Sequence, residues 1–318
     1  MCAEIEEVSN PHDTRYKALF GNKKHFLGLL KDCVKPDWLD DLDIASLRKS
    51  EKSFILQDFS KKEADVVYEA ILNGEKVIFY ILLELQSSVD YEMPYRLLLY
   101  ITEILRQYRN AADENEREQK GFKLPAVIPM VFFSGSEKWS VPTSFKKILA
   151  NYEKFGSYIL DFDYLLIDVK GYTKEDLKKF SSKLLGIVLM LEKAKNDVEF
   201  YEYLRENVNE IKGLNKEDRR ILNMCVDIMD IAYGYNQSEK IKEIFELNQV
   251  KEVNGMLVDM IENAKKEREE LIEKGVMKKA IEAAQNLLKM GDSVEKVSIA
   301  MELPIEKVQK IKDDMVMV

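Results

Sequence analysis

Acidic side chains occur inside two apolar runs that are separated by a tight turn. Asp65 belongs to the run 63–72 and Glu84 to the run 75–86, with Asn73-Gly74 between them. Asn-Gly is the strongest short-range signal of a β-hairpin because both residues tolerate a positive φ angle. Carboxylates among Val, Ile, Phe and Leu are costly to bury unless their charge is compensated, and a divalent metal ion is the usual compensation. The pattern therefore predicts a metal site on a hairpin.

The spacing of these residues predicts which face of the hairpin they share. With a two-residue loop, Asp65 faces Leu82, and Glu84 is its diagonal neighbour on the same face. Diagonal neighbours lie roughly 7–8 Å apart at the backbone, so two carboxylates there could share one cation. Gln86 follows on that face because side chains alternate along a strand. The alternative is a sheet edge whose polar side chains face water, and the residues alone do not choose between the two.

The expected metal ligands are all oxygen atoms. They are the carboxylates of Asp65 and Glu84 and the backbone carbonyl of Leu85. Such ligands suit Mg²⁺, with Mn²⁺ or Ca²⁺ as substitutes, and Mg²⁺ keeps waters that a phosphate can replace. The cation would lower the pKa of a bound water and offset charge on phosphoryl oxygens during in-line displacement. Gln86 would position water or phosphate, although an amide supplies no positive charge.

Two further pairs of residues could support this chemistry from predicted helices. Asp13 and Lys17 share a helix face at i, i+4 and could form an ion pair beside the site. Asp13 could equally cap its helix, and Lys17 is a candidate for the positive charge that Gln86 lacks. Arg96 and Tyr100 share a face of the helix after the hairpin. Arg96 could bind a phosphate bidentately, or it could be a structural arginine that neutralises carboxylates.

Composition indicates an intracellular globular protein. The chain has 318 residues, which is enough for two compact domains with a sizeable core. Of these residues 46% are hydrophobic and 33% are charged, as is typical of a globular protein with a charged surface. Three widely spaced cysteines argue for a reducing compartment and against a disulfide framework or a zinc site. No stretch approaches the ~20 apolar residues that span a bilayer. The acidic N-terminus does not resemble a signal peptide, so we expect no membrane partner and a cytoplasmic location.

Several other chemistries are disfavoured. The chain has only two histidines, His12 and His25, too few for a zinc hydrolase with three imidazole ligands. A Ser-His-Asp triad would have to use one of them without a Gly-x-Ser-x-Gly elbow, and no phosphate-binding loop of the Gly-x-x-x-x-Gly-Lys type occurs. The net charge of −9 means that any DNA-binding surface must be local, or that a metal offsets the carboxylates.

The first half of the chain alternates predicted helices and strands. Such interleaving predicts a mixed α/β sheet covered by helices. The elements are a helix at 14–34 broken near Gly21-Asn22 and capped by Asp13 or Thr14, the hairpin at 63–87, an amphipathic helix at 92–110, a buried strand at 126–133 and one or two strands within 157–169.

The second half shows only helical periodicity. The predicted domains are an α/β domain at 1–172, a helical domain at 173–257 and a C-terminal extension at 258–318. The extension would contain a charged helix to 274, an amphipathic helix between Gly275 and Gly291, and a pair that resembles a helix-turn-helix at 294–301 and 305–311. The turn of this pair lacks Gly, and Asp313-Asp314 follows its lysines, so an interaction or dimerisation motif is favoured over DNA readout. We expect a homodimer through the helical C-terminal part.

Motifs along most of the chain resemble those of the PD-(D/E)XK nuclease superfamily. The likeness is greater to one branch, the transposase-like Rpn family of recombination-promoting nucleases. The motifs are Pro11–Phe20, Asp65 before the hairpin, Glu84-Leu85-Gln86-Ser87, Met93–Tyr100 and Leu124–Gly135. Gln86 departs from the superfamily's usual Lys but fits the Glu-x-Gln of the Rpn branch.

The resemblance implies a fold and a reaction. The fold would be a restriction-endonuclease-like sheet, and the reaction would be metal-dependent endonucleolytic cleavage of DNA that promotes recombination or serves mobile elements. Asp65, Glu84 and Leu85 would hold the metal, with Asp13 completing its site, and Gln86 would position water or phosphate. The alternative is a degenerate nuclease fold that acts as a DNA- or protein-binding regulatory module.

Overall fold

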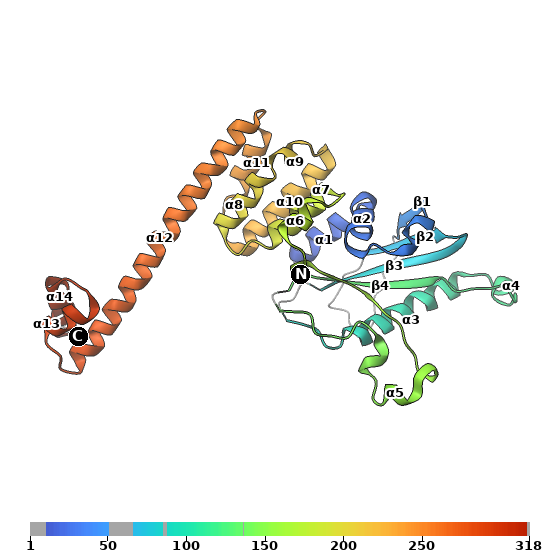
Figure 1. The fold of residues 1–318 in the computed structure, drawn as a ribbon, viewed down its shortest axis with the longest axis horizontal. Coiled ribbons are helices and arrows are strands. Elements are labelled where there is room, and N and C mark those ends of the chain that lie inside the picture. The colour runs from blue at the N-terminus through green and yellow to red at the C-terminus, as the bar shows by residue number, and fades with distance from the viewer. Residues whose placement is uncertain (1–10, 51–65, 85–87, 136, 317–318) are drawn as a thin grey trace, which may run out of the picture. The chain divides into compact units, whose positions relative to one another are not determined.

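The computed structural model describes residues 11–50, 66–84, 88–135 and 137–316 (Figure 1), and the side chains of 11–13, 82–84 and 316 lie outside the description as well. The chain forms two compact units, Met1–Asn254 and Gly255–Val318. Three residues predicted to form the site, Asp65, Leu85 and Gln86, lie outside the described residues. Asp13 and Glu84 are described by their backbones alone.

The described strands form one mixed sheet, as predicted. Its order is β1–β2–β3–β4–β5; β1 to β3 run antiparallel in succession, whereas β4 and β5 run parallel to β3. The bounds are β1 Leu42–Lys49, β2 Val66–Leu72, β3 Glu75–Glu84, β4 Ala126–Phe133 and β5 Leu165–Asp168. The α/β class and the helical C-terminal part are confirmed.

The β2–β3 hairpin has the predicted turn and register. Leu72 pairs with Glu75, and the pairing continues without a shift to Val66 and Ile81. Asn73 has a φ of 50° and Gly74 a φ of 82°, which are the left-handed conformations that a tight hairpin loop requires. A two-residue loop therefore sets the register of both strands, as the Asn-Gly signal predicted.

Two other strands show where sequence patterns succeed and fail. The apolar run at Ala126–Phe133 forms β4, as predicted, and Pro129 lies where β5 has not yet begun to pair with β4. A proline lacks the N–H of a ladder bond, so it is tolerated where a strand has a neighbour on only one side. β1 was not predicted. Only Leu42 and Leu47 of β1 are buried, and its register with β2 shifts between Asp43 and Arg48.

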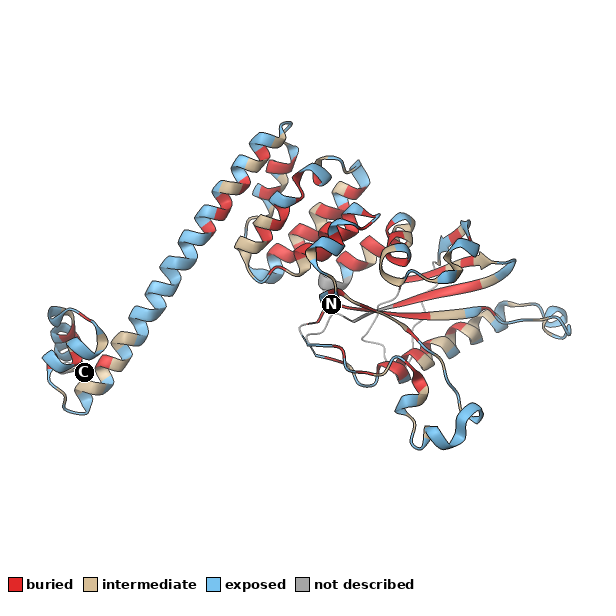
Figure 2. Ribbon diagram, viewed as in Figure 1, coloured by how far each residue is buried: buried red, intermediate tan, exposed pale blue. Residues whose placement is uncertain are grey.

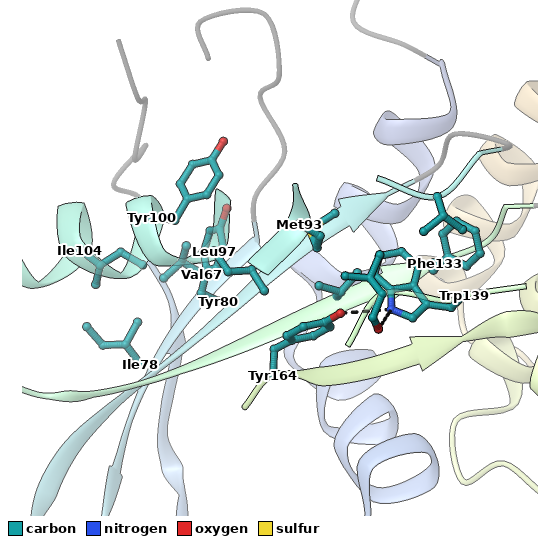
Figure 3. Close-up of a cluster of buried hydrophobic side chains, with 13 residues drawn as sticks. Val67, Ile78, Tyr80, Met93, Leu97, Tyr100, Ile104, Phe133, Trp139 and Tyr164 are labelled. Atoms are coloured by element: carbon teal, nitrogen blue, oxygen red, sulfur yellow. Dashed lines mark hydrogen bonds between the residues drawn. The ribbon is translucent and has the colours of Figure 1, made fainter. Parts of the chain in front are cut away.

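Helix α3 (Met93–Ala111) covers one face of the sheet (Figure 3). A single buried cluster joins Met93, Leu97 and Tyr100 of α3 to Ile78 and Tyr80 of β3. The loop after β4 closes this core: the Nε1–H of Trp139 donates to the Val141 carbonyl and to the Tyr164 hydroxyl, each at 3.1 Å.

The opposite face packs against the N-terminal helices α1 (Pro11–Gly21) and α2 (Lys23–Leu29). Phe26 stacks on Tyr68 with ring centroids 4.1 Å apart, and Tyr16 lies 4.6 Å from Phe132. Because Tyr68 and Phe132 alternate with residues of the α3 side, the sheet is covered on both faces.

The predicted break between the N-terminal helices is confirmed, because the side chain of Asn22 caps α2 by accepting from Lys24 N. The capping prediction was wrong: α1 begins at Pro11, so Asp13 and Thr14 lie within its first turn rather than before it.

Helices after residue 172 complete the first unit. Helix α10 packs against α1, and α7 packs against α2, so they continue the layer that covers the sheet (Figure 2). The domain boundary that the sequence predicts at residue 172 stays a prediction. The helices are α6 Lys174–Lys178, α7 Lys183–Glu192, α8 Asp197–Glu206, α9 Val208–Lys212, α10 Lys216–Tyr233 and α11 Ser238–Glu246. The shorter elements are η1 Leu30–Val34, η2 Asp37–Asp41, α4 Glu114–Arg117, η4 Phe145–Ile148, α5 Tyr152–Phe155, η5 Gly156–Tyr158 and η6 Val169–Gly171.

The second unit, Gly255–Val318, contains most of α12 (Val250–Lys289) and the two helices that follow it. Helices α13 (Val294–Met301) and α14 (Ile305–Val316) fold back on α12 around a core that includes Ala284, Val297 and Val308. The predicted pair of terminal helices thus forms. The prediction of separate helices on either side of Gly275 was wrong, because α12 runs through this glycine. No helix among the described residues combines the length and the apolar character needed to cross a membrane.

Candidate active site

The described residues next to the predicted metal ligands lie at one end of the sheet. Asp65 immediately precedes Val66, the first residue of β2, and Val66 pairs with Ile81 of β3. Glu84 is the last residue of β3 and pairs with Phe133 at the end of β4. The structure therefore places the backbone of Glu84 and the start of β2 at the same end of the hairpin. The convergence of the two carboxylates on one cation stays a prediction.

The sheet beside this end is strongly apolar on the α3 side. The rings of Tyr80 and Tyr100 have centroids 5.0 Å apart, and both residues are almost fully buried. Met93, at the start of α3, is also fully buried. Tyr100, predicted to contact a substrate phosphate, is thus a member of the core cluster (Figure 3).

Arg96 lies in the first turns of α3 and is only 4% exposed. Its guanidinium forms an ion pair with the carboxylate of Asp90, in the segment just before the helix. This contact matches the structural alternative, in which the arginine neutralises a carboxylate. A bidentate phosphate contact would compete with that pair, because both use the same planar group.

Lys17 lies on the other side of the sheet, in a pocket of about 330 Å³ between α1, α10 and the end of β1. The pocket is also lined by Lys49, Arg220 and Glu217, so cations outnumber carboxylates there. Lys49 pairs with Tyr68 of β2, three residues from Asp65 in sequence. The basic pocket therefore lies towards the end of the sheet at which β2 begins.

The described carboxylates nearby have other partners. Glu69 of β2 lies 3.3 Å from Arg48 Nη2 and 3.8 Å from Lys76 Nζ. Where side chains are described, in 14–50, 66–81, 88–135 and 137–315, no group of three or more His, Cys, Asp or Glu residues could hold a metal ion. The predicted metal ligands fall outside these ranges.

A buried hydrogen-bonded chain was not predicted from the sequence. His25 Nδ1 lies 2.8 Å from Ser182 Oγ, and His25 Nε2 lies 3.0 Å from Asp218 Oδ1. Burial lowers the pKa of His25 below its ordinary value, which favours the neutral imidazole. Nε2–H then donates to Asp218, and Nδ1 accepts from the Ser182 hydroxyl.

These residue types resemble a hydrolytic triad, but their surroundings indicate a structural role. All three are at most 3% exposed, and Ser182 caps α7 by accepting from Leu185 N. The chain of hydrogen bonds joins α2, α7 and α10. No sequence spacing could have revealed it, because the partners are 157 and 193 residues from His25.

A second buried contact also joins the N-terminal helix to the later helices. Arg15 of α1 is fully buried and forms an ion pair with Glu192 at the end of α7. Burial raises the pKa of Glu192, and the charge of Arg15 opposes that rise. The guanidinium also lies 4.9 Å from the ring centroid of Tyr16. This pair holds α1 against α7, and through α1 it supports the sheet.

One family model matches most of the first unit. Residues 10–222 match the family model described as "Putative transposase, YhgA-like". The matched range includes the sheet, both layers of helices that cover it and the first part of α10.

Curated relatives carry nuclease names. Recombination-promoting nuclease RpnD of Escherichia coli O157:H7 is 24% identical over 137 residues, which are 42% of this chain and 50% of the relative. RpnC of strain K12 is 23% identical over 127 residues, 40% of each chain. The inactive recombination-promoting nuclease-like protein RpnE of strain K12 is 23% identical over 129 residues, again 40% of each. The chain thus matches half or less of the length of these relatives. No solved structure matches it.

Proposed function

The chain belongs to the YhgA-like transposase family and is similar to relatives named recombination-promoting nucleases, and from this premise we propose that it is a metal-dependent DNA endonuclease. The observation that carries the proposal is the β2–β3 register. It fixes Val66 opposite Ile81, and a continuation of β2 by one residue would bring Asp65 to the end of the hairpin at which the backbone of Glu84 lies. The family names support DNA as the substrate and recombination as the context.

The proposed ligand set follows from strand geometry. Side chains alternate along a strand, so we expect Glu84 on the face of Tyr80, and Asp65 on the face of Val67. Val67 and Tyr80 are paired and belong to the cluster under α3. The two carboxylates would therefore share one apolar face, where a hard divalent cation fits their oxygen donors and the Leu85 carbonyl. When bound, the cation would activate water and offset charge on the scissile phosphate.

Other residues would act around this centre. Gln86 would orient water or a phosphate oxygen through its amide. Asp13 and Lys17 belong to α1 on the opposite face of the sheet, so they would reach this centre only around the end of the sheet at which β2 begins, where Lys17 shares a basic pocket with Lys49 and Arg220. Arg96 and Tyr100 would act mainly by fixing α3 on the sheet, because both are buried and Arg96 is paired with Asp90.

One observation favours a second candidate function. RpnE, which matches this chain at 23% identity, is named as inactive. A sheet that has lost catalysis could still bind DNA or protein as a regulatory module. The Gln at position 86, in place of the superfamily's Lys, keeps this alternative open.

Cleavage of supercoiled plasmid DNA tests the proposal. Purified wild-type protein is incubated with Mg²⁺, Mn²⁺, Ca²⁺ or EDTA, beside Asp65→Ala, Glu84→Ala and Glu75→Ala. Glu75 is the matched control, because it is an exposed Glu on the same strand and pairs with Lys123. We expect metal-dependent nicking or linearisation that falls about 100-fold or more in the two site variants, as is typical when a group that stabilises transition-state charge is removed. Equal cleavage by all four proteins would indicate a contaminant, and no cleavage with any metal would favour the regulatory module.

A further inference from the structure

Three neighbouring pockets of the first unit form one groove along α2, α1 and α10, and α1 contacts both of the other helices (Figure 1). One pocket, of about 590 Å³, is lined by Lys23 of α2 and Lys31 of η1. It shares Asn22 with the pocket of about 330 Å³ that contains Lys49. This pocket in turn shares Arg220 with a third pocket, of about 700 Å³, between α10 and α11. We call the three pockets together the basic groove.

The lining of the basic groove carries more positive than negative charge, although acidic residues outnumber basic ones in the whole chain. Nine lysines and arginines line it, against the three carboxylates of Glu217, Asp227 and Glu246. Asn22 Nδ2 donates to Glu217 at 2.8 Å. Lys242 Nζ lies 2.9 Å from Asp227, so the charges of this pair offset each other. The groove is therefore a local positive surface on a chain whose net charge is −9.

Some cations of the basic groove are engaged within the fold, and others face solvent. Lys24 pairs with Asp218. Arg219 donates to the Phe245 carbonyl. The exposed cations that pair with no carboxylate in the described part of the chain are Lys31, Lys49, Lys216 and Arg220. Each of the three pockets contains at least one of these four, so uncompensated positive charge extends along the whole groove.

A row of exposed cations fits a polyanion better than a single anion. Lys23 and Lys31 lie on the consecutive helical turns of α2 and η1 and are about 12 Å apart along the axis, at roughly 1.5 Å per residue. One strand of duplex DNA carries a phosphate every ~3.4 Å along its axis, so this part of the groove alone matches about three or four phosphates. Lysine and arginine are the residues that neutralise such phosphates.

We propose that the basic groove binds the phosphate backbone of duplex DNA, with Lys31, Lys49 and Arg220 as contacts. The choice of DNA as the polyanion rests on the proposed function. The groove lies on the α1 side of the sheet, whereas the proposed metal site lies on the α3 side, so the groove holds the duplex that flanks the scissile phosphate. Contacts to phosphate position a duplex and carry no sequence information.

Fluorescence anisotropy of a short labelled duplex in EDTA tests the proposal, with salt varied between about 50 and 200 mM. The triple variant Lys31→Ala/Lys49→Ala/Arg220→Ala should lower the slope of log affinity against log salt by about 3 and raise the dissociation constant at least about tenfold. A second triple variant, Lys31→Arg/Lys49→Arg/Arg220→Lys, keeps the charges and should bind as wild type does.

Lys123→Ala is the matched control for the binding measurement. Lys123 is an exposed lysine that pairs with Glu75 beside the hairpin turn, at the opposite end of the sheet from Lys49. This variant should keep the affinity and the salt slope of wild type. All variants must melt at the wild-type temperature, so that a change in binding reports the groove alone.

The outcomes separate the partner and the kind of contact. Two duplexes of unrelated sequence should lose affinity by the same factor in the alanine triple variant, because phosphate contacts are independent of sequence. Unequal losses would indicate base contacts and contradict the proposal. Displacement of the duplex by polyglutamate at an equal concentration of charge would show that the groove takes acidic polypeptides, and would contradict it as well. Wild-type affinity in the alanine triple variant, or no binding by wild type at about 50 mM salt, would overturn it.

Failure of this inference and failure of the proposed function are distinguishable, because binding is measured without a divalent metal. Binding through the groove without plasmid cleavage would refute the nuclease and uphold the groove. Plasmid cleavage by wild type, together with unchanged DNA binding in the alanine triple variant, would refute the groove and uphold the nuclease.

Discussion

The ring of Tyr80 in β3 packs against the ring of Tyr100 in α3, with centroids 5.0 Å apart and planes inclined by 33°. This contact fixes the helix after the hairpin on the face of the sheet where we propose that the Glu84 carboxylate lies. The packing also gives Tyr100 a role that needs no substrate, because the ring is 2% exposed.

Substitution of Tyr100 separates packing from substrate contact. Tyr100→Phe keeps the ring, so we expect DNA cleavage to stay within a few-fold of wild type. Tyr100→Ala removes a buried aromatic side chain and should lower the free energy of unfolding by about 3–5 kcal/mol. Urea unfolding and plasmid cleavage measure the two effects. A Phe variant that is stable and yet inactive would show that the hydroxyl contacts the substrate, as the sequence suggested.

The Arg96–Asp90 pair should contribute to stability as a unit. Arg96→Ala leaves the partly buried Asp90 carboxylate without its partner, so we expect a loss of about 3–5 kcal/mol, the range typical of broken buried pairs. The double variant Arg96→Ala/Asp90→Ala should lose less than the sum of the single variants. A double-mutant cycle from urea unfolding gives the coupling. Additive losses would show that the two side chains do not stabilise each other, and the Arg96 guanidinium would then be a candidate for binding phosphate.

The stability of the first unit should depend on pH through His25. Burial lowers the folded-state pKa of His25 below the ordinary value of 6.5, against the opposing influence of Asp218, while Lys24 lowers it further. The unfolded chain therefore binds a proton more readily, so the stability contributed by the neutral form is complete above pH 6.5 and is lost as the pH falls below it.

Thermal unfolding of wild type and His25→Gln between pH 8 and pH 5 measures this dependence. The other titrating groups are the same in both proteins, so their effect on the melting temperature cancels in the comparison. We expect the melting temperature of wild type to fall more steeply than that of the variant below about pH 6.5. Parallel curves would show that His25 titrates as it does in the unfolded chain.

The buried Arg15–Glu192 pair should be more important for folding than the exposed pairs. Glu192→Ala leaves a fully buried guanidinium, so we expect a loss of about 3–5 kcal/mol. Lys178→Ala breaks an exposed pair with Glu206, and this control should cost about 0–1 kcal/mol. Both values come from urea unfolding. Similar losses in the two variants would contradict the role of Arg15 as the anchor of α1.

Local signals explain which parts of the fold the sequence could predict. The hairpin register follows from the two residues Asn73 and Gly74, and β4 follows from an uninterrupted apolar run. Strand β1 has only two buried residues, so it lacks the alternation that marks a strand. Gly275 was taken as a helix end, but the strong helix formers around it outweigh the unfavourable propensity of a single glycine.

For the candidate site, the sequence could predict only local relationships. The register of β2 with β3 follows from the Asn73-Gly74 turn, and the convergence of Asp65 and Glu84 stays a prediction. The contacts of His25 with Ser182 and Asp218 depend on how distant helices pack, and no spacing rule covers them. Buried ion pairs such as Arg15–Glu192 could not be predicted from the sequence for the same reason.

Direct measurement of Mn²⁺ binding tests the central claim, that Asp65 and Glu84 together hold a divalent cation. Electron paramagnetic resonance of free Mn²⁺ is followed as wild type, Asp65→Ala, Glu84→Ala and the control Glu75→Ala are titrated. We predict that wild type and Glu75→Ala bind Mn²⁺ with the same affinity, and that both site variants lose this binding while they keep the wild-type circular dichroism. Unchanged Mn²⁺ binding in Asp65→Ala and Glu84→Ala would contradict the account.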